Sequence, residues 1–262
     1  MTHYAAEVSY DGGKFFGWQV QPGLPTVQLA LENALSLING SAVAVAGAGR
    51  TDAGVHARAQ VCSFDMACEW EPRRLVLAVN AHLPDGVSVM RAAAAPEDFH
   101  ARFCAKEREY RYFIWNESTI YPHLEGRVFW LKQKRFDWGR AAQAAKYLLG
   151  THDFANFSHA EESVKDTFRT ITRIRLYRRP PLIVFQIRGD GFLHNMVRIT
   201  LGNMELAASG LIEPHEITGL LDRSKTRSDG GRTYPACGLY LWKIGYRGDI
   251  WKKAEPRQPA LR

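Results

Sequence analysis

Apolar and polar residues follow two different periods along the first third of the chain. Four segments have the composition of strands: 3–10, 42–49, 58–66 and 87–94. Two segments have apolar residues at helical spacing: 26–39 and 72–83. Thr26 is placed to cap the first of these helices, and Gly40 is placed to end it. The order is βαββαβ, which is the order of a ferredoxin-like unit.

The remaining two thirds of the chain show the same order with longer insertions. Strand patterns cover 109–115, 169–179, 181–189 and 238–246. Helix patterns cover 137–149, 192–209 and 214–222. No sequence repeat is detectable, so the doubling is one of architecture. We therefore expect an α+β fold of two ferredoxin-like (βαββαβ) halves, 1–105 and 106–246, whose antiparallel sheets form a central cleft, followed by a tail at 247–262.

Charge is distributed unevenly between these halves. The chain has 34 Lys and Arg against 27 Asp and Glu, a net charge of +7. Residues 1–105 hold 7 basic and 10 acidic residues and so carry −3, while the rest of the chain carries +10. Such asymmetry indicates either a surface that meets a polyanion or a basic surface that keeps the protein soluble. The charge alone favours neither.

Several classes of protein do not fit the composition. The sequence has no run of about 18 apolar residues that could span a membrane, and its first ten residues lack the basic and apolar parts of a signal peptide. The four cysteines have no CxxC spacing, so we expect reduced, mostly buried thiols in the cytosol rather than disulfides or a zinc site. We expect no membrane partner and no metal.

One segment is richer in candidate chemistry than the others: GAGRTDAGVHARAQV, residues 47–61. It begins like a dinucleotide fingerprint, but Asp52 stands where the third glycine belongs and no helical pattern follows. RSKTRSDGG (223–231) lacks the spacing of a P-loop. Asp52 and His56 are too few ligands for a metal, and no activated serine or cysteine indicates a hydrolase. From the residues alone, the main interpretation is a tight turn in which Asp52 caps the backbone.

The same segment resembles the tRNA pseudouridine synthase A family. GRTDAGVHA (49–57) is the most specific of six matching motifs. The others are FGWQVQP (16–22), KEREYRYFIW (106–115), GTHDFANFS (150–158), GFLHNMVR (191–198) and PACGLYL (235–241). Together they keep the family's order over nearly the whole chain. The sequence departs from the family pattern at Ala59, Asn195 and Ile199, where glycine, histidine and asparagine are usual.

The resemblance implies an isomerase that converts uridine to pseudouridine in the anticodon stem-loop of tRNA, at positions 38, 39 and 40. The base leaves the ribose at N1, turns and rejoins the ribose through C5. The reaction therefore needs no nucleotide cofactor and no cofactor of another kind. The resemblance also implies a cytoplasmic homodimer whose central cleft binds the RNA. Two alternatives stay open: a non-catalytic RNA-binding protein with two ferredoxin-like units, and a pseudouridine synthase that acts on another RNA.

Three residues match the catalytic positions of the family. Asp52 matches the catalytic aspartate, which either attacks C1′ or removes the C2′ proton. Tyr110 matches the active-site tyrosine, whose ring can stack on the freed uracil while its hydroxyl lies near C5. Arg198 matches the active-site arginine. Because an ionised carboxylate in a site that excludes water needs a nearby cation, we expect an ion pair between Arg198 and Asp52.

Further residues are assigned to RNA binding. Arg50 adjoins Asp52, and the resemblance implies that it helps to flip the uridine out of its stem. His56 either stabilises the turn or faces the RNA, and we interpret His152 and His194 as structural first and as phosphate or base contacts second. Arg173 and Arg175 belong to a group of basic residues that can follow the tRNA backbone. The others in this group are Arg108, Arg111, Lys132, Lys134, Arg135, Arg178 and Arg179.

Overall fold

The structure is a computed structural model, and it describes residues 1–132, 136–159 and 166–251. The chain forms two compact units: unit 1 is Met1–Lys106 with Leu241–Arg262, and unit 2 is Glu107–Tyr240. The division after Lys106 lies one residue from the boundary that the sequence predicted. The last strand differs from the prediction. Most of β10 (Leu239–Tyr246) groups with unit 1, because it pairs beside a strand of that unit, β3.

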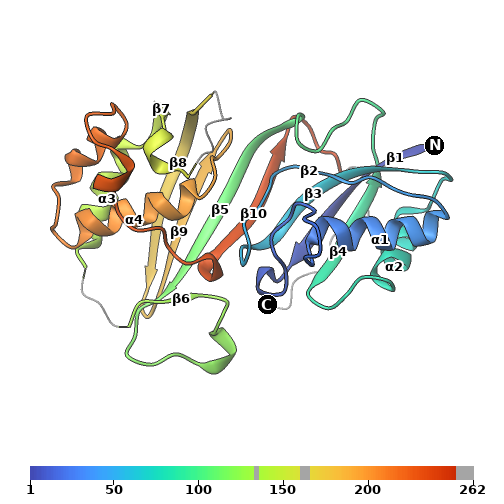
Figure 1. The fold of residues 1–262 in the computed structure, drawn as a ribbon, viewed down its shortest axis with the longest axis horizontal. Coiled ribbons are helices and arrows are strands. Elements are labelled where there is room, and N and C mark those ends of the chain that lie inside the picture. Colours follow the sequence, from blue (N-terminus) through green and yellow to red (C-terminus); the bar gives the residue numbers. More distant parts are fainter. Residues whose placement is uncertain (133–135, 160–165, 252–262) are drawn as a thin grey trace. The chain divides into compact units, whose positions relative to one another are not determined.

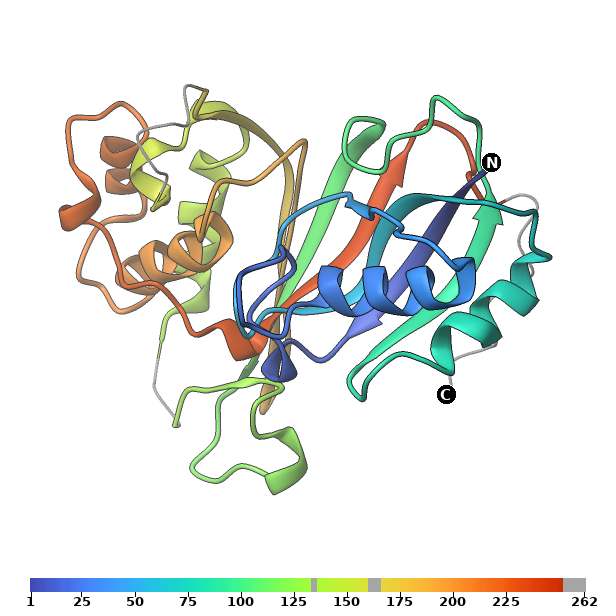
Figure 2. The same cartoon turned by 45° about the vertical axis from the view of Figure 1, so that its right-hand side comes forward.

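Unit 1 is an antiparallel sheet that carries two helices. Its own strands are β1 (Thr2–Tyr10), β2 (Ala46–Gly47), β3 (His56–Met66) and β4 (Val87–Ala94). β1 lies between β3 and β4, and β2 pairs with β3. Its helices are α1 (Val27–Asn39) and α2 (Pro72–Asn80). They pack side by side against the sheet (Figures 1 and 2), so the βαββαβ order predicted for this part of the chain is confirmed.

Side-chain caps set the helix ends of unit 1. Thr26 accepts a hydrogen bond from the backbone N–H of Leu29, and Gly40, with a φ of +73°, ends α1. Both caps are as predicted. α2 ends at Asn80, earlier than the predicted residue 83, and the Asn80 side chain bonds both the N–H and the C=O of Val89 in β4.

The strand predicted over 42–49 is wrong for most of that segment. The backbone N–H of Val43 donates to the Ser36 hydroxyl at 2.9 Å, and the N–H of Val45 donates to the Glu32 carboxylate at 3.1 Å. These bonds tie the segment to side chains of α1 rather than to a neighbouring strand. The two residues of β2 pair with β3, and the backbone N–H of Ala48 adds one bond to the Val61 carbonyl of β3 at 2.8 Å.

Unit 2 is also a sheet with helices on it. Its strands are β5 (Ala105–Trp115), β6 (Phe129–Trp130), β7 (Gly150–Asp153), β8 (Phe168–Arg179) and β9 (Leu182–Gly189). The antiparallel order is β5-β9-β8-β7, and β6 runs parallel to β5. Its helices are α3 (Trp138–Tyr147) and α4 (Met196–Ala208). The short helix predicted at 214–222 is the 3₁₀ helix η4 (Pro214–Leu220).

Short 3₁₀ helices connect these elements in the described part of the chain. They are η1 (Gly12–Lys14), η2 (Pro122–Leu124), η3 (Ala155–Phe157), η5 (Arg227–Asp229) and η6 (Ala236–Gly238). With the helices and antiparallel strands of both units, they make up the predicted α+β fold, which is confirmed. The cleft between two sheets stays a prediction.

The pairing of β5 with β9 sorts the side chains of unit 2 onto two faces of its sheet. One face carries the pairs Tyr110–Ile187, Tyr112–Phe185 and Ile114–Ile183. The opposite face carries Glu109–Arg188 and Arg111–Gln186. Ile114 and Leu176 line an apolar space together with residues of α3 and α4, so these helices cover the first face (Figure 1). We call it the helix-covered face.

The thiols are less buried than predicted. Cys62 is buried, and burial raises the pKa of its thiol to about 12, so it stays protonated and unreactive. Cys68 is exposed, and Cys104 and Cys237 are half-buried. All four are free cysteines. In residues 1–132, 136–159 and 166–251, no helix is long and apolar enough to cross a membrane, and no three His, Cys, Asp or Glu side chains are grouped to bind a metal.

Candidate active site

Asp52 lies in the tight turn that leads into β3 of unit 1. The backbone N–H of Val55 donates to the carbonyl of Asp52 at 3.1 Å and closes the turn. Gly54 has a φ of +79°, a left-handed conformation that a residue with a side chain resists. Asp52 itself is half-buried. The tight turn predicted from the glycines is confirmed, and a hydrogen bond of its own backbone fixes the main chain at Asp52.

A second loop of unit 1 braces this turn. The N–H of Trp18 donates to the carbonyl of Thr51 at 3.0 Å, and the Thr51 hydroxyl bonds the hydroxyl of Tyr10 at 2.8 Å. Gly17 approaches so closely that an added Cβ would lie 2.7 Å from the Thr51 carbonyl oxygen. At Gly47, an added Cβ would lie 2.4 Å from the Trp18 ring. The FGWQVQP motif therefore supports the turn that carries Asp52, a role that spacing alone did not reveal.

The two other predicted site residues of unit 1 differ in exposure. His56 is 2% exposed, and its Nδ1 accepts from the backbone N–H of Gly12 at 3.1 Å. The Asp11 carboxylate lies 3.3 Å from the same nitrogen. Of the two roles predicted for His56, this burial favours stabilising the turn over contacting RNA. Arg50, by contrast, is exposed beside Asp52.

Tyr110 lies in β5 on the helix-covered face of unit 2. It is 8% exposed, and its ring meets the edge of the Phe192 ring with 5.2 Å between centroids. Two of the motifs that carry the resemblance therefore pack against each other. Tyr112, two residues further on, is completely buried, donates its hydroxyl to the carbonyl of Pro235 at 2.7 Å, and has a pKa that burial raises. Tyr112 is thus a structural tyrosine, which makes it a useful comparison for Tyr110.

Arg198 is held in a fixed orientation on the first turn of α4. Its Nε donates to the carbonyl of Tyr234 and its Nη1 donates to Oδ1 of Asn195, both at 2.5 Å. Asn195 is the N-cap residue of α4 and has a left-handed φ of +60°. Its amide therefore orients the guanidinium at one of the positions where the sequence departs from the family pattern. Sequence reasoning missed this role of Asn195, because it depends on a contact between side chains.

The basic residues predicted to follow the tRNA backbone do not all lie on one face. Arg173 and Arg175 are exposed, and their strand partners Arg188 and Gln186 place them on the face of the sheet opposite to Tyr110. Lys134 and Arg135 lie outside the described residues.

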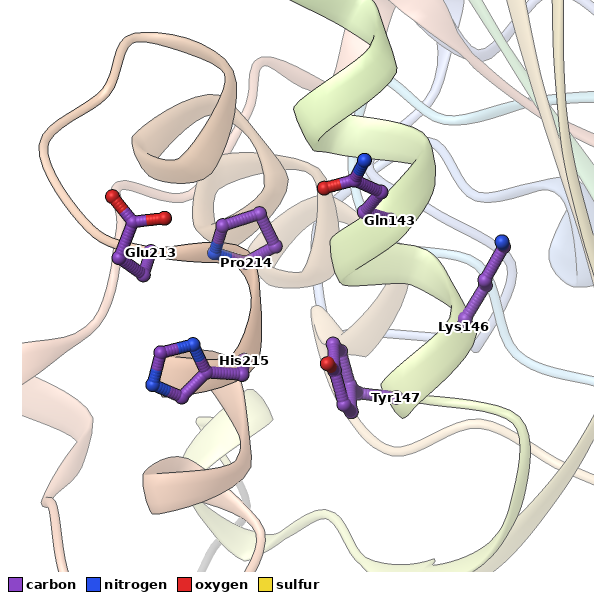
Figure 3. A pocket seen from close by; sticks show the side chains of 6 residues that line it. All are labelled: Gln143, Lys146, Tyr147, Glu213, Pro214 and His215. Atoms are coloured by element: carbon purple, nitrogen blue, oxygen red, sulfur yellow. The ribbon is translucent and has the colours of Figure 1, made fainter.

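A hollow of about 600 Å³ lies in unit 2 between α3 and the start of η4 (Figure 3). It is lined by Gln143, Lys146, Tyr147, Glu213, Pro214 and His215. None of the predicted catalytic or RNA-binding residues lines it, and its side chains form no recognisable catalytic set. The chemistry is therefore assigned to the motif residues and not to this hollow.

The predicted site residues are divided between the two units. Unit 1 holds Arg50, Asp52 and His56, and unit 2 holds Tyr110, Arg173, Arg175 and Arg198. Within unit 2, Phe192 and Arg198 follow each other in one motif, and the first of them packs on Tyr110. The ion pair predicted between Asp52 and Arg198 stays a prediction.

Comparisons with known proteins agree with the motifs. The sequence model of the family described as tRNA pseudouridine synthase matches residues 6–104 and 144–247. Proteins with the curated name tRNA pseudouridine synthase A are similar over most of their length. That of Shouchella clausii is 41% identical, with 100% of both chains covered. That of Bacillus subtilis is 42% identical, with 91% of this chain and 97% of that protein covered. That of Neisseria meningitidis serogroup C (strain 053442) is 41% identical, with 93% and 91% covered.

A chain of a solved Cbf5–Nop10–Gar1 complex aligns with 77% of this chain and 44% of its own length, at a TM-score of 0.35 and 11% identity, and this weak likeness supports no conclusion. The family model and the full-length relatives are decisive without it. The chain belongs to the tRNA pseudouridine synthase family, and it is an isomerase that converts uridine in tRNA to pseudouridine.

Proposed function

We propose that this synthase isomerises uridines 38, 39 and 40 of the tRNA anticodon arm, with Asp52 as the catalytic carboxylate. The observation that carries the proposal is the braced turn: Gly17 and Trp18 fix the backbone that presents Asp52. A carboxylate that is already in place can act on the sugar without reorganising, which lowers the barrier. Breaking the bond between N1 and C1′ and rejoining the base through C5 involves neither redox change nor transfer to a second molecule.

Replacing Asp52 by asparagine tests this assignment. The amide keeps the shape of the side chain but cannot act as a nucleophile or a base, so we expect the rate to fall by about a thousandfold or more. The measurement is tritium release from tRNA that contains [5-³H]uridine, because only isomerisation frees the label from C5. Asp65→Asn removes an exposed carboxylate of β3, the strand that follows the Asp52 turn, and is the control that keeps activity. An Asp52→Asn enzyme with an ordinary rate would refute the proposal.

Tyr110 is proposed to assist proton transfer at C5 and to stack on the free uracil. Tyr110→Phe keeps the ring and removes the hydroxyl, so we expect turnover to fall by about 10²- to 10⁴-fold while tRNA binding is kept. Tyr112→Phe is the matched control. It loses the bond to the Pro235 carbonyl, so it should lower the free energy of unfolding by about 1 kcal/mol and keep turnover. Equal turnover of the two variants would remove the role from Tyr110.

Arg198 is proposed to pair with Asp52 and keep the carboxylate ionised. Arg198→Lys keeps the charge but cannot donate to both the Tyr234 carbonyl and Asn195, so its single ammonium is not held in place. We expect a loss of turnover of about a hundredfold. Full activity of Arg198→Lys would contradict the pairing.

The two chemical roles of Asp52 can be separated with labelled tRNA. If Asp52 removes the C2′ proton, deuterium at C2′ of the target uridine slows the reaction by a primary isotope effect. If Asp52 attacks C1′, the C–D bond stays intact and the rate changes little. Single-turnover rates with the deuterated and the unlabelled tRNA decide between the roles.

The remaining assignments concern the surroundings of the enzyme. We propose that the chain acts as a cytoplasmic homodimer that binds tRNA, and that Arg50 helps to flip the uridine. Mapping pseudouridine in tRNA from cells that lack this protein tests the target: we expect unmodified uridines at positions 38, 39 and 40 only. Loss of pseudouridine from another RNA instead would favour the alternative substrate. Sedimentation of the purified protein with and without tRNA tests the dimer.

A further inference from the structure

Unit 2 gathers cationic side chains from three separate segments around Arg198. The backbone N–H of His159 donates to the carbonyl of His194, and Nδ1 of His194 donates to the carbonyl of His159, both at 3.2 Å. Nε2 of His159 and Nη2 of Arg227 both contact the Thr233 hydroxyl, at 3.2 and 3.3 Å. We call His159, His194, Arg198 and Arg227 the cationic cluster.

The cluster is connected to Arg198 through one amide. Asn195 accepts from Nη1 of Arg198 at 2.5 Å, and its Nδ2 contacts Nε2 of His194 at 3.2 Å. His194 therefore uses both ring nitrogens within the protein. The donors left for a ligand belong to the outer members of the cluster, His159 and Arg227.

No described carboxylate neutralises Arg227. Its bonds go to the carbonyl of Gly231 at 2.9 Å and to the Thr233 hydroxyl, both neutral groups. Asp229, two residues away, instead accepts from the N–H and hydroxyl of Thr226 at 2.7 and 2.8 Å. His159 shows the same imbalance: although the residue is exposed, partial loss of solvent lowers its pKa, and so do the charges of Arg227, His194 and Arg198, with no acid among the causes.

Arg227 is half-buried, which makes the missing acid significant. Its Nε is buried and has no hydrogen-bond partner among the described residues. A guanidinium taken partly out of water is unfavourable unless an anion compensates it. Three other half-buried arginines of the chain each have a carboxylate partner: Arg91 pairs with Glu7 at 2.9 Å, Arg140 with Glu213 at 3.0 Å and Arg188 with Glu109 at 2.6 Å.

We propose that Arg227 and His159 form a phosphate site beside Arg198, and that this site takes a phosphodiester of the tRNA backbone. The proposal rests on the proposed function, in which Arg198 acts at the reacting nucleotide. A guanidinium fork suits two phosphate oxygens, and the imidazole of His159 adds a donor when its second nitrogen carries a proton. Because phosphodiesters flank every nucleotide, such a site would hold a uridine next to the catalytic residues whatever the neighbouring base.

Arg227→Gln tests the site, and Arg223→Gln is its matched control. Both variants remove one positive charge from the same loop, but Arg223 already pairs with Asp153, its Nε donating to the carboxylate at 2.7 Å. We expect Arg227→Gln to weaken binding of whole tRNA by about tenfold at low salt and to lower the slope of log K against log salt by about 1. Arg223→Gln should leave both unchanged. Equal effects of the two variants overturn the proposal.

His159→Gln gives a second test, since His159 is exposed and its loss does not endanger the fold. We expect it to weaken tRNA binding by about threefold, as the loss of one hydrogen bond to a phosphate does. The double variant with Arg227→Gln should lose less than the product of the two single losses, because both residues serve one phosphate. Exact multiplication of the two losses would place the residues on separate contacts and overturn the shared site.

Chemical substitution in the RNA identifies the ligand group. In synthetic anticodon stem-loops, one phosphate at a time is replaced by a neutral methylphosphonate. We expect one replacement, next to the target uridine, to weaken binding of the stem-loop to the unmodified enzyme. The Arg227→Gln enzyme should bind this same stem-loop as tightly as the unmodified enzyme does. If no position has this effect, the phosphate assignment is wrong.

Failure of the proposed function gives a different result. Binding is measured here without catalysis, so a wrong chemical role for Asp52 changes tritium release but leaves the Arg227→Gln comparison intact. A wrong target RNA shows as weak binding of the stem-loops to the unmodified enzyme. A wrong phosphate site shows only as equal behaviour of Arg227→Gln and Arg223→Gln toward an RNA that the enzyme binds and modifies.

Discussion

Two groups of arginines in unit 2 look alike in the sequence and differ in the fold. On the sheet face opposite to the helices, Glu109 accepts from Arg111 at 2.8 Å, from Gln186 at 2.7 Å and from Arg188 at 2.6 Å. In the cationic cluster, Arg227 contacts only neutral groups among the described residues. The Glu109 carboxylate compensates the charges of the first group, whereas no described carboxylate compensates Arg227 in the second. The position of acids around an arginine, and not the number of arginines, therefore separates a structural role from a ligand-binding role.

The pKa of Glu109 shows the energetic effect of this charge compensation. Burial alone would raise the pKa of this carboxyl, which is 2% exposed. Hydrogen bonds from Arg111 and Gln186 and the charges of Arg188 and Arg111 outweigh burial, so the pKa is lowered overall. The charged form of Glu109 is thus the stable one in the folded protein, and each partner contributes to the stability of the sheet.

The sharpest test of this comparison replaces one arginine of each group by methionine. Arg188→Met leaves Glu109 buried with part of its compensation removed, so we expect the free energy of unfolding to fall by about 2 kcal/mol. Arg227→Met removes a charge that has no described acid, and we expect a change within about 0.5 kcal/mol. Urea denaturation measures both. If Arg227→Met is destabilised as much as Arg188→Met, Arg227 is structural and the comparison fails.

Acid sensitivity gives the next largest effect. Because the pKa of Glu109 is lowered below its ordinary 4.5, its contribution to stability is complete above pH 4.5 and is lost as the pH falls through the folded value. Glu109→Gln, which cannot titrate, should be less stable than the natural protein at pH 7 and should lose less stability between pH 5 and pH 3. If the free energy of unfolding of both proteins fell equally with pH, the arginines would not lower the pKa of Glu109.

The exposed arginines of β8 extend the comparison to smaller effects. Arg173 and Arg175 are solvated, so they carry no burial cost, and they lie on the face away from Tyr110. We expect the double variant Arg173→Gln with Arg175→Gln to weaken tRNA binding by less than about threefold, and so less than Arg227→Gln alone. Filter binding at several salt concentrations measures this. A slope lowered by about 2 would show that both residues contact phosphates, as the sequence predicted.

Local signals in the sequence predicted most of the fold. The Thr26 cap, the end at Gly40 and the alternation of Tyr110, Tyr112 and Ile114 each depend on neighbours a few residues away, and all three are confirmed. The predicted strand over 42–49 failed because Ser36 and Glu32 take its backbone N–H groups. That competition depends on tertiary packing, which periodicity does not contain.

The candidate site divides in the same way. Motif resemblance predicts Asp52, Tyr110 and Arg198 as catalytic residues, since each stands inside a specific motif, and these roles stay predictions. It did not reveal Asn195 as the residue that orients Arg198, or the approach of His159 to Arg227. The contact between Asn195 and Arg198 joins residues three apart and depends on side-chain direction, whereas the approach of His159 to Arg227 joins residues far apart in the chain. Charge counting drew attention to Arg173 and Arg175, because exposed and half-buried arginines look the same in a sequence.

The smallest effect expected is on the titration of His159. Its pKa lies below the ordinary 6.5 because of burial and then of the charges of Arg227, His194 and Arg198. Among these charges, that of Arg227 lowers the pKa of His159 the most. Arg227→Met should therefore raise this pKa, while Arg223→Met should leave it unchanged. Since the folded pKa of His159 is depressed, the stability of the protein decreases as the pH falls from 6.5 to that value.

A bound phosphate favours the protonated ring of His159, so tRNA should raise the pKa of this ring. For the same reason, tRNA should bind more tightly as the pH falls through this range. NMR titration of the His159 ring, assigned with His159→Gln, measures these shifts. A pKa that neither Arg227→Met nor tRNA moves would mean that no phosphate lies against His159, and the two groups of arginines would then differ only in burial.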